Sequence, residues 1–300
     1  MPMTPTLLPV LALPLAVALA APADRVVTDT TLVTKANEAA VRLLVDPGAP
    51  AMPILTEEAA ARAGLKAGPF GIGYRVGPVM VAGRSAVGRI GLGDAPAKRR
   101  IGWTANPYAP GYDGVVGPGG LPDPVVRFQL RAARPDERTI DIPMADDGGL
   151  FGNWGASNGV LTIDGQPLQV RFSLQQDATI ATAGAALTLA KAFGGTLDDD
   201  RAEAEIVFGV KRPVRTLRLA RPFTIGPIAL TTLLARTTDF GNADGIAASG
   251  TTPDPDEVVV TAKGKRDHKR DRVILGRSAL SGCSSVAFDK PAKLIRLTCL

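Results

Sequence analysis

The stretch VRLLVDPGAPAMPILTEEAAARAGL, residues 41–65, decides the fold prediction for this chain. It opens with an apolar run that is typical of a buried β-strand, and this run ends on Asp46. A Pro-Gly turn follows, and then an alanine-rich run that is typical of a helix. The pattern therefore predicts a carboxylate at the end of a buried strand, where the chain turns. Such a group either does chemistry or is a solvated turn residue, since aspartate favours turns.

Composition favours many short strands. The 300 residues are 45% hydrophobic and 21% charged, which is enough for one large domain or two halves of ordinary size. The chain contains 33 glycines and 25 prolines but only 5% aromatic residues, a balance that suits short strands joined by turns. The net charge of +5 is spread over scattered basic residues without interleaved aromatics. We therefore expect no nucleic-acid partner.

The first twenty residues predict export. They carry no charged side chain and end in Ala18-Leu19-Ala20, an A-x-A cleavage pattern. We interpret residues 1–20 as a signal peptide and expect a periplasmic or secreted protein that begins near Ala21. A membrane-anchoring helix is the alternative interpretation. No later segment is apolar enough to span a membrane, so no transmembrane span is expected after signal removal.

Cysteine and histidine counts narrow the chemistry. Cys283 and Cys299 are the only cysteines, and in an exported chain they predict a disulfide, with two buried free thiols as the alternative. The single histidine, His268, lies in a charged run, which argues against a histidine base, and two cysteines with one histidine leave too few ligands for a zinc site. No glycine-rich phosphate-binding motif is present, so no cofactor is expected. An enzyme with this sequence would have to use carboxylates.

The chain contains two halves with matching patterns. The segments GVVGPGGLPDPVVRFQL (114–130) and RVILGRSALSGCSSVAFD (272–289) each predict an apolar strand, a glycine, a short helical turn and an antiparallel hairpin. The openings also match, since VRLLVD and VRFSLQ each run into a polar turn and an alanine-rich helix. The predicted organisation is an N-terminal half at 21–144, a linker at 145–159, and a C-terminal half at 160–300 with a flexible insertion at 239–272.

This arrangement resembles the aspartic protease family, in its two-lobed pepsin-like or tandem retropepsin-like form. Residues 44–49, LVDPGA, are similar to the signature hydrophobic-hydrophobic-Asp-Thr/Ser-Gly-Ala, with Pro47 in place of the hydroxyl residue. The triplets that end in Gly117 and Gly276 are similar to the family's closing motif, which packs beneath the active loop. The resemblance implies a mainly β acid-protease fold, with two pseudo-symmetric β-barrel-like lobes and short helices.

The resemblance also implies site residues. Asp46 and Asp177 would be the catalytic pair, because two carboxylates about 3 Å apart share one proton and divide the acid and base roles. The glycine-rich run GPFGIGYRVG (68–77) would form a flap, and Gly48, Gly71 and Tyr74 would bind substrate. An alignment of the two openings without gaps places Gln175 under Asp46. Asp177 reaches that position only if the second loop carries two extra residues.

Two functions remain open at this stage. The first is an exported aspartic-type endopeptidase that binds an extended peptide or protein substrate between its lobes. The second is a non-catalytic periplasmic peptide- or protein-binding module of the same fold. The position of the Asp177 carboxylate relative to Asp46 separates the two. A third arrangement, in which Asp46 pairs with Asp46 of another chain, would also supply two carboxylates.

Overall fold

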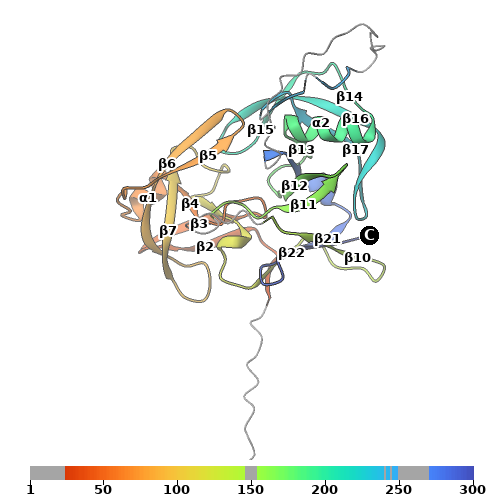
Figure 1. Ribbon diagram of the computed structural model, residues 1–300. Helices are drawn as coiled ribbons and strands as arrows, with labels where there is room; N and C mark the ends of the chain where they lie inside the picture. The colour runs from red at the N-terminus through yellow and green to blue at the C-terminus, as the bar shows by residue number, and fades with distance from the viewer. Residues whose placement is uncertain (1–23, 146–153, 240, 244, 249–269) are drawn as a thin grey trace, which may run out of the picture.

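The computed structural model describes residues 24–145, 154–239, 241–243, 245–248 and 270–300. The described chain is mainly β and forms several sheets, which confirms the predicted fold class at that level (Figure 1). The predicted signal peptide, His268, and most of the predicted linker and insertion lie outside the described residues.

A seven-stranded sheet, here called the first-half sheet, is built from the stretch that opened the sequence analysis and its neighbours (Figure 1, orange to yellow). The helix predicted after the Pro-Gly turn is α1 (Glu57–Arg62), and the hydroxyl of Thr56 caps it by accepting a hydrogen bond from the N–H of Ala59. Across the sheet the order is β2 (Thr31–Ala36), β3 (Ala39–Val45), β8 (Gly114–Val116), β4 (Ile54–Thr56), β7 (Ala97–Thr104), β6 (Val79–Ile90) and β5 (Gly71–Val76).

An eight-stranded sheet, the second-half sheet, repeats the local pattern. Its helix α2 (Ala183–Phe193) begins after Thr182, whose hydroxyl accepts from the N–H of Ala185, and ends at Gly194 with φ +72°. The strand order is β11 (Gly159–Ile163), β12 (Gln166–Phe172), β20 (Arg272–Leu275), β13 (Ile180–Ala181), β17 (Ile228–Arg236), β16 (Lys211–Ile225) and β14 (Gly195–Leu197), with β15 (Ala202–Glu205) also on β16. A separate two-stranded ribbon consists of β18 (Thr238–Asp239) and β19 (Gly241–Asn242).

A five-stranded sheet joins both ends of the chain. Its order is β1 (Arg25–Val27), β9 (Val125–Gln129), β21 (Cys283–Asp289), β22 (Leu294–Cys299) and β10 (Arg138–Pro143). The predicted helical turns before β9 and β21 are η1 (Pro118–Gly120) and α3 (Arg277–Leu280). The hairpin expected from β9 and β10 is wrong, because the β21–β22 hairpin lies between them. Strand β21 is buried almost throughout, so both of its edges need strand partners, and β9 supplies one of them.

The predicted disulfide is confirmed. Cys283 and Cys299 are paired residues of the β21–β22 hairpin, and their sulfur atoms are bonded. Beside this hairpin one hydrophobic core contains side chains from all three large sheets. The ring of Phe288 lies edge-on to those of Phe128 and Phe172, with centroids 5.9 and 6.4 Å away. Strands from both halves of the chain therefore share a single packed interior.

Candidate functional site

Asp46 lies at the end of β3, as the sequence predicted, but it is completely buried. Its backbone N–H donates to the carbonyl of Val116 on the parallel neighbour β8, and its side chain is 0% exposed. One carboxylate oxygen accepts from Gly48 N at 2.9 Å, and the other accepts from Leu174 N at 2.7 Å. The hydroxyl of Ser173 lies 3.5 Å away. The interpretation of Asp46 as a solvated turn residue is therefore wrong.

The surroundings of Asp46 shift its titration. Burial raises the pKa of this carboxyl group from 3.8 to about 6, because removal of water penalises the charged form. The hydrogen bonds from Leu174, Gly48 and Ser173 and the charge of Arg171 act in the opposite direction but do not outweigh burial. Asp46 thus changes protonation in the mildly acidic range.

The position that corresponds to Asp46 in the second half is occupied by Ser173. Strand β12 pairs in parallel with β20 as β3 pairs with β8, and Ser173 N donates to Leu275 O as Asp46 N donates to Val116 O. The ungapped alignment of Gln175 with Asp46 is therefore wrong by two residues. The alignment was wrong because β12 ends at Phe172, the residue after Arg171. This end is earlier than the apolar pattern of the first half suggested.

The second loop is also shorter than the first. After the loops, Ile54 pairs with Val115 and Ile180 pairs with Ile274 in equivalent antiparallel positions. The stretch from Ser173 to Ile180 is one residue shorter than the stretch from Asp46 to Ile54. The two extra residues that would have carried an aspartate into the Asp46 position are not there.

The structure does not bring Asp177 to Asp46. The Asp177 side chain is 73% exposed, and its carboxylate lies 3.6 Å from Arg277. None of the groups that shift the Asp46 pKa is Asp177. Gln175 is exposed as well, whereas Gln176 turns inward and donates to the carbonyl of Ile206. The first two residues after β12, not Asp177, are the ones that touch the Asp46 carboxylate.

The two closing glycines pack beneath the two loops, as the resemblance implied. A Cβ on Gly117 would lie 2.0 Å from the carbonyl oxygen of Ala49. A Cβ on Gly276 would lie 2.3 Å from the carbonyl oxygen of Asp177. Both contacts are with backbone atoms that cannot move aside cheaply, so only glycine fits at either position.

The predicted flap is a hairpin of β5 and β6, with its turn after Val76 and Gly77 at φ +61°. The tip of the hairpin lies on the second half of the chain. Val76 packs with Ile180 and Ile206, and a Cβ on Gly77 would lie 2.4 Å from a carboxylate oxygen of Asp239. The tip therefore rests against side chains of the second-half sheet and its loops.

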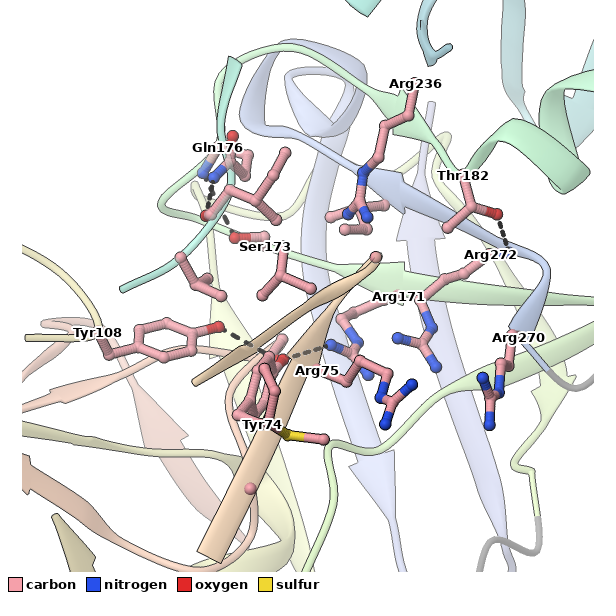
Figure 2. A pocket seen from close by; sticks show the side chains of 18 residues that line it. Tyr74, Arg75, Tyr108, Arg171, Ser173, Gln176, Thr182, Arg236, Arg270 and Arg272 are labelled. Carbon is pink, nitrogen blue, oxygen red and sulfur yellow. Dashed lines mark hydrogen bonds between the residues drawn. The ribbon is translucent and has the colours of Figure 1, made fainter. Parts of the chain in front are cut away.

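A cavity of about 350 Å³ lies under this hairpin and is lined by both halves of the chain (Figure 2). Gly48 and Tyr74, which the resemblance placed at the substrate site, line it, but Gly71 does not. Tyr108, which sequence reasoning missed, is buried beside it and donates to the carbonyl of Gly48 at 3.4 Å. The ring of Tyr108 packs edge-on against Phe208. Its contacts come from distant loops, so no sequence signal marked it.

The cavity is also rich in arginine, which sequence reasoning did not foresee. Among the described residues five arginines line it, and no aspartate or glutamate does: Arg75, Arg171, Arg236, Arg270 and Arg272. They come from four separate segments, and only Arg270 and Arg272 are close in the sequence. The pairing of those segments, which brings the five together, is visible only in the fold.

The described residues contain no group of three or more histidine, cysteine, aspartate or glutamate side chains that could hold a metal ion. Within the same residues, no helix is both long and apolar enough to cross a membrane. No protein-family model and no curated protein matches this chain.

Proposed function

We propose that this protein is an aspartic-protease-like protein with two pseudo-symmetric lobes, which binds extended peptides and does not hydrolyse them with a carboxylate pair. The observation that carries the proposal is the serine at position 173. The second-half equivalent of Asp46 is a hydroxyl group, so the described site offers one carboxyl group where the family mechanism needs two. A lone carboxyl group has no partner with which to share a proton and divide acid and base roles.

The bonding of Asp46 supports a structural role for it. Its two oxygens accept hydrogen bonds from Gly48 in its own loop and from Leu174 in the opposite loop. The carboxylate thereby links the ends of β3 and β12, which are far apart in the sequence. We infer that Asp46 positions the two loops beneath the cavity and leaves the cavity walls to bind the ligand.

The shape of the cavity supports an extended peptide as ligand. Strand β5 is the last strand in the order of the first-half sheet, and its residues from Gly73 to Val76 line the cavity. An extended peptide can pair with such a sheet edge, with the backbone supplying affinity and pockets for alternate side chains supplying specificity. A volume of about 350 Å³ lies within the range of ligand pockets.

Export to the periplasm or beyond is part of the proposal. The uncharged apolar run before Ala21 supports it, and so does the disulfide between Cys283 and Cys299, because such bonds persist in oxidising compartments.

The test is a combined cleavage and binding assay with a peptide library between pH 3 and pH 7. We expect no pepstatin-sensitive cleavage by mass spectrometry, and binding of some peptides by fluorescence anisotropy. Tyr74→Ala, which changes the cavity wall, should weaken binding. Tyr112→Ala, which removes a tyrosine that does not line the cavity, is the matched control and should not.

Cleavage that disappears in both Asp46→Asn and Asp177→Asn would overturn the proposal in favour of an active peptidase. If Tyr74→Ala and Tyr112→Ala weaken peptide binding equally, the peptide binds elsewhere on the molecule.

A further inference from the structure

The charge of the cavity under the hairpin is strongly one-sided. In the part of the chain that the structure describes, five arginines and no acidic residue are among its lining side chains. In Figure 2 the guanidinium groups of Arg75, Arg171, Arg270 and Arg272 gather at one end of the cavity, and Arg236 reaches in from the other. Asp46, which interacts electrostatically with Arg171, and Asp239, which pairs with Arg236, are not among the lining residues.

Arg171 is a buried cation whose hydrogen-bond partners are neutral. Its side chain is 8% exposed, and it donates to Asn158 Oδ1 at 2.9 Å and to the hydroxyl of Tyr74 at 3.0 Å. Among the described residues no carboxylate forms an ion pair with it, although the charge of Asp46 acts on it from further away. A buried charge of this kind is costly unless a counter-ion approaches it.

Arg236 supplies a buried donor that is not used. It is 5% exposed and forms an ion pair with Asp239 at 2.9 Å through one terminal nitrogen. Its Nε is buried and has no hydrogen-bond partner among the described residues. The Asp239 charge balances that of Arg236, so this arginine adds a buried N–H group without a described partner rather than a net charge.

Arg75 adds an exposed cation at the mouth of the cavity. It lies on β5 of the hairpin, and no ion pair joins its guanidinium to any described residue. Arg75 and Arg171 thus leave two positive charges on the cavity wall that no described acidic side chain pairs with. Guanidinium groups bind carboxylates through two parallel N–H donors, which gives both affinity and orientation.

We propose that this cavity binds the carboxylate of an acidic side chain, presented by an extended peptide that pairs along β5. The rest of the lining suits the stem of such a side chain, because Met80, Val207 and Ile274 are apolar and Tyr74 adds a ring. The peptide part of this inference rests on the proposed function, whereas the recognition of an oxyanion by the arginines does not.

The test compares two fluorescent peptides, acetyl-Ala-Ala-Glu-Ala-Ala and its Gln counterpart, in anisotropy titrations at pH 7. We expect the Glu peptide to bind at least tenfold more tightly at 50 mM salt, and the preference to shrink at 500 mM salt. Arg75→Gln and Arg171→Gln should each reduce the preference severalfold. Arg84→Gln, an exposed arginine on the same hairpin that does not line the cavity, is the matched control.

Competition separates this inference from the proposed function. Glutarate should displace the Glu peptide, and inorganic phosphate should do so less well. Another outcome is that glutarate binds, that Arg75→Gln abolishes this binding, and that neither peptide binds. This outcome would retain the anion site and overturn peptide binding. Equal affinity for the two peptides would overturn the anion site and retain peptide binding. Phosphate that binds more tightly than glutarate, or a preference unchanged in Arg75→Gln, would overturn the assignment to a carboxylate.

Discussion

Replacing Asp46 with asparagine keeps the shape of the side chain and removes its charge, so it measures what burial does to this carboxyl group. In the folded protein burial raises the Asp46 pKa from 3.8 to about 6. Between about pH 4 and pH 6 the folded protein therefore holds a proton that the unfolded chain releases. This contribution to stability is fully present below pH 4 and is lost as the pH rises through about 6.

The size of the effect follows from the two pKa values. A tenfold change in an equilibrium constant corresponds to about 1.4 kcal/mol, so the difference between 3.8 and about 6 corresponds to about 3 kcal/mol. Asparagine cannot accept hydrogen bonds from both Leu174 and Gly48 as the carboxylate does. These bonds favour the ionised form and are already included in the pKa of about 6, so they add no pH dependence beyond the shift itself.

The assay is urea unfolding of wild type and Asp46→Asn at pH 4, 5, 6 and 7. We expect the free energy of unfolding of the variant, relative to wild type, to rise by about 2 kcal/mol from pH 4 to pH 7, because part of the full effect of about 3 kcal/mol is already lost at pH 4. All other titrating groups are common to both proteins and cancel in this difference. Asp177→Asn is the control and should follow the wild-type profile, because that side chain is 73% exposed. A relative stability of Asp46→Asn that does not change with pH would refute the reasoning.

Three further predictions concern the disulfide, the second loop and export. Reduction of the Cys283–Cys299 bond should lower the free energy of unfolding by about 2–4 kcal/mol, and thiol labelling under denaturing, non-reducing conditions should find no free thiol. Ser173→Asp would place a second carboxylate about 4 Å from Asp46, so we expect a loss of up to about 4 kcal/mol in urea unfolding at pH 7 and a smaller loss at pH 4. Mass spectrometry of protein from the native cell envelope should find a chain that begins near Ala21, and an intact Met1 in the cytoplasm would contradict export.

Local patterns predicted much of the fold, because they depend on neighbouring residues. The strand that ends at Asp46 and the helix after Thr56 follow from runs of fewer than about a dozen residues, whereas the flap hairpin and the glycines beneath the loops followed from the family resemblance. The pairing of β9 with β21 could not be predicted in this way. Strand pairing across more than 150 residues depends on which edges need partners in the complete sheet.

The site was harder to predict than the fold for the same reason. The position opposite Asp46 depends on where β12 ends, and an error of two residues in that boundary exchanged Ser173 for Gln175. The arginines of the cavity stand on separate strands and loops, and no single stretch of sequence brings them together. Asp46 was found because a carboxylate after an apolar run is a local pattern.

The most direct test of the central claim, that Asp46 has no carboxyl partner, is a carboxyl-carbon NMR titration of Asp46. The account predicts a single titration with a midpoint near pH 6, unchanged in Asp177→Asn. Two linked midpoints for Asp46, or a midpoint that moves when Asp177 is replaced, would show a shared proton and would contradict the account.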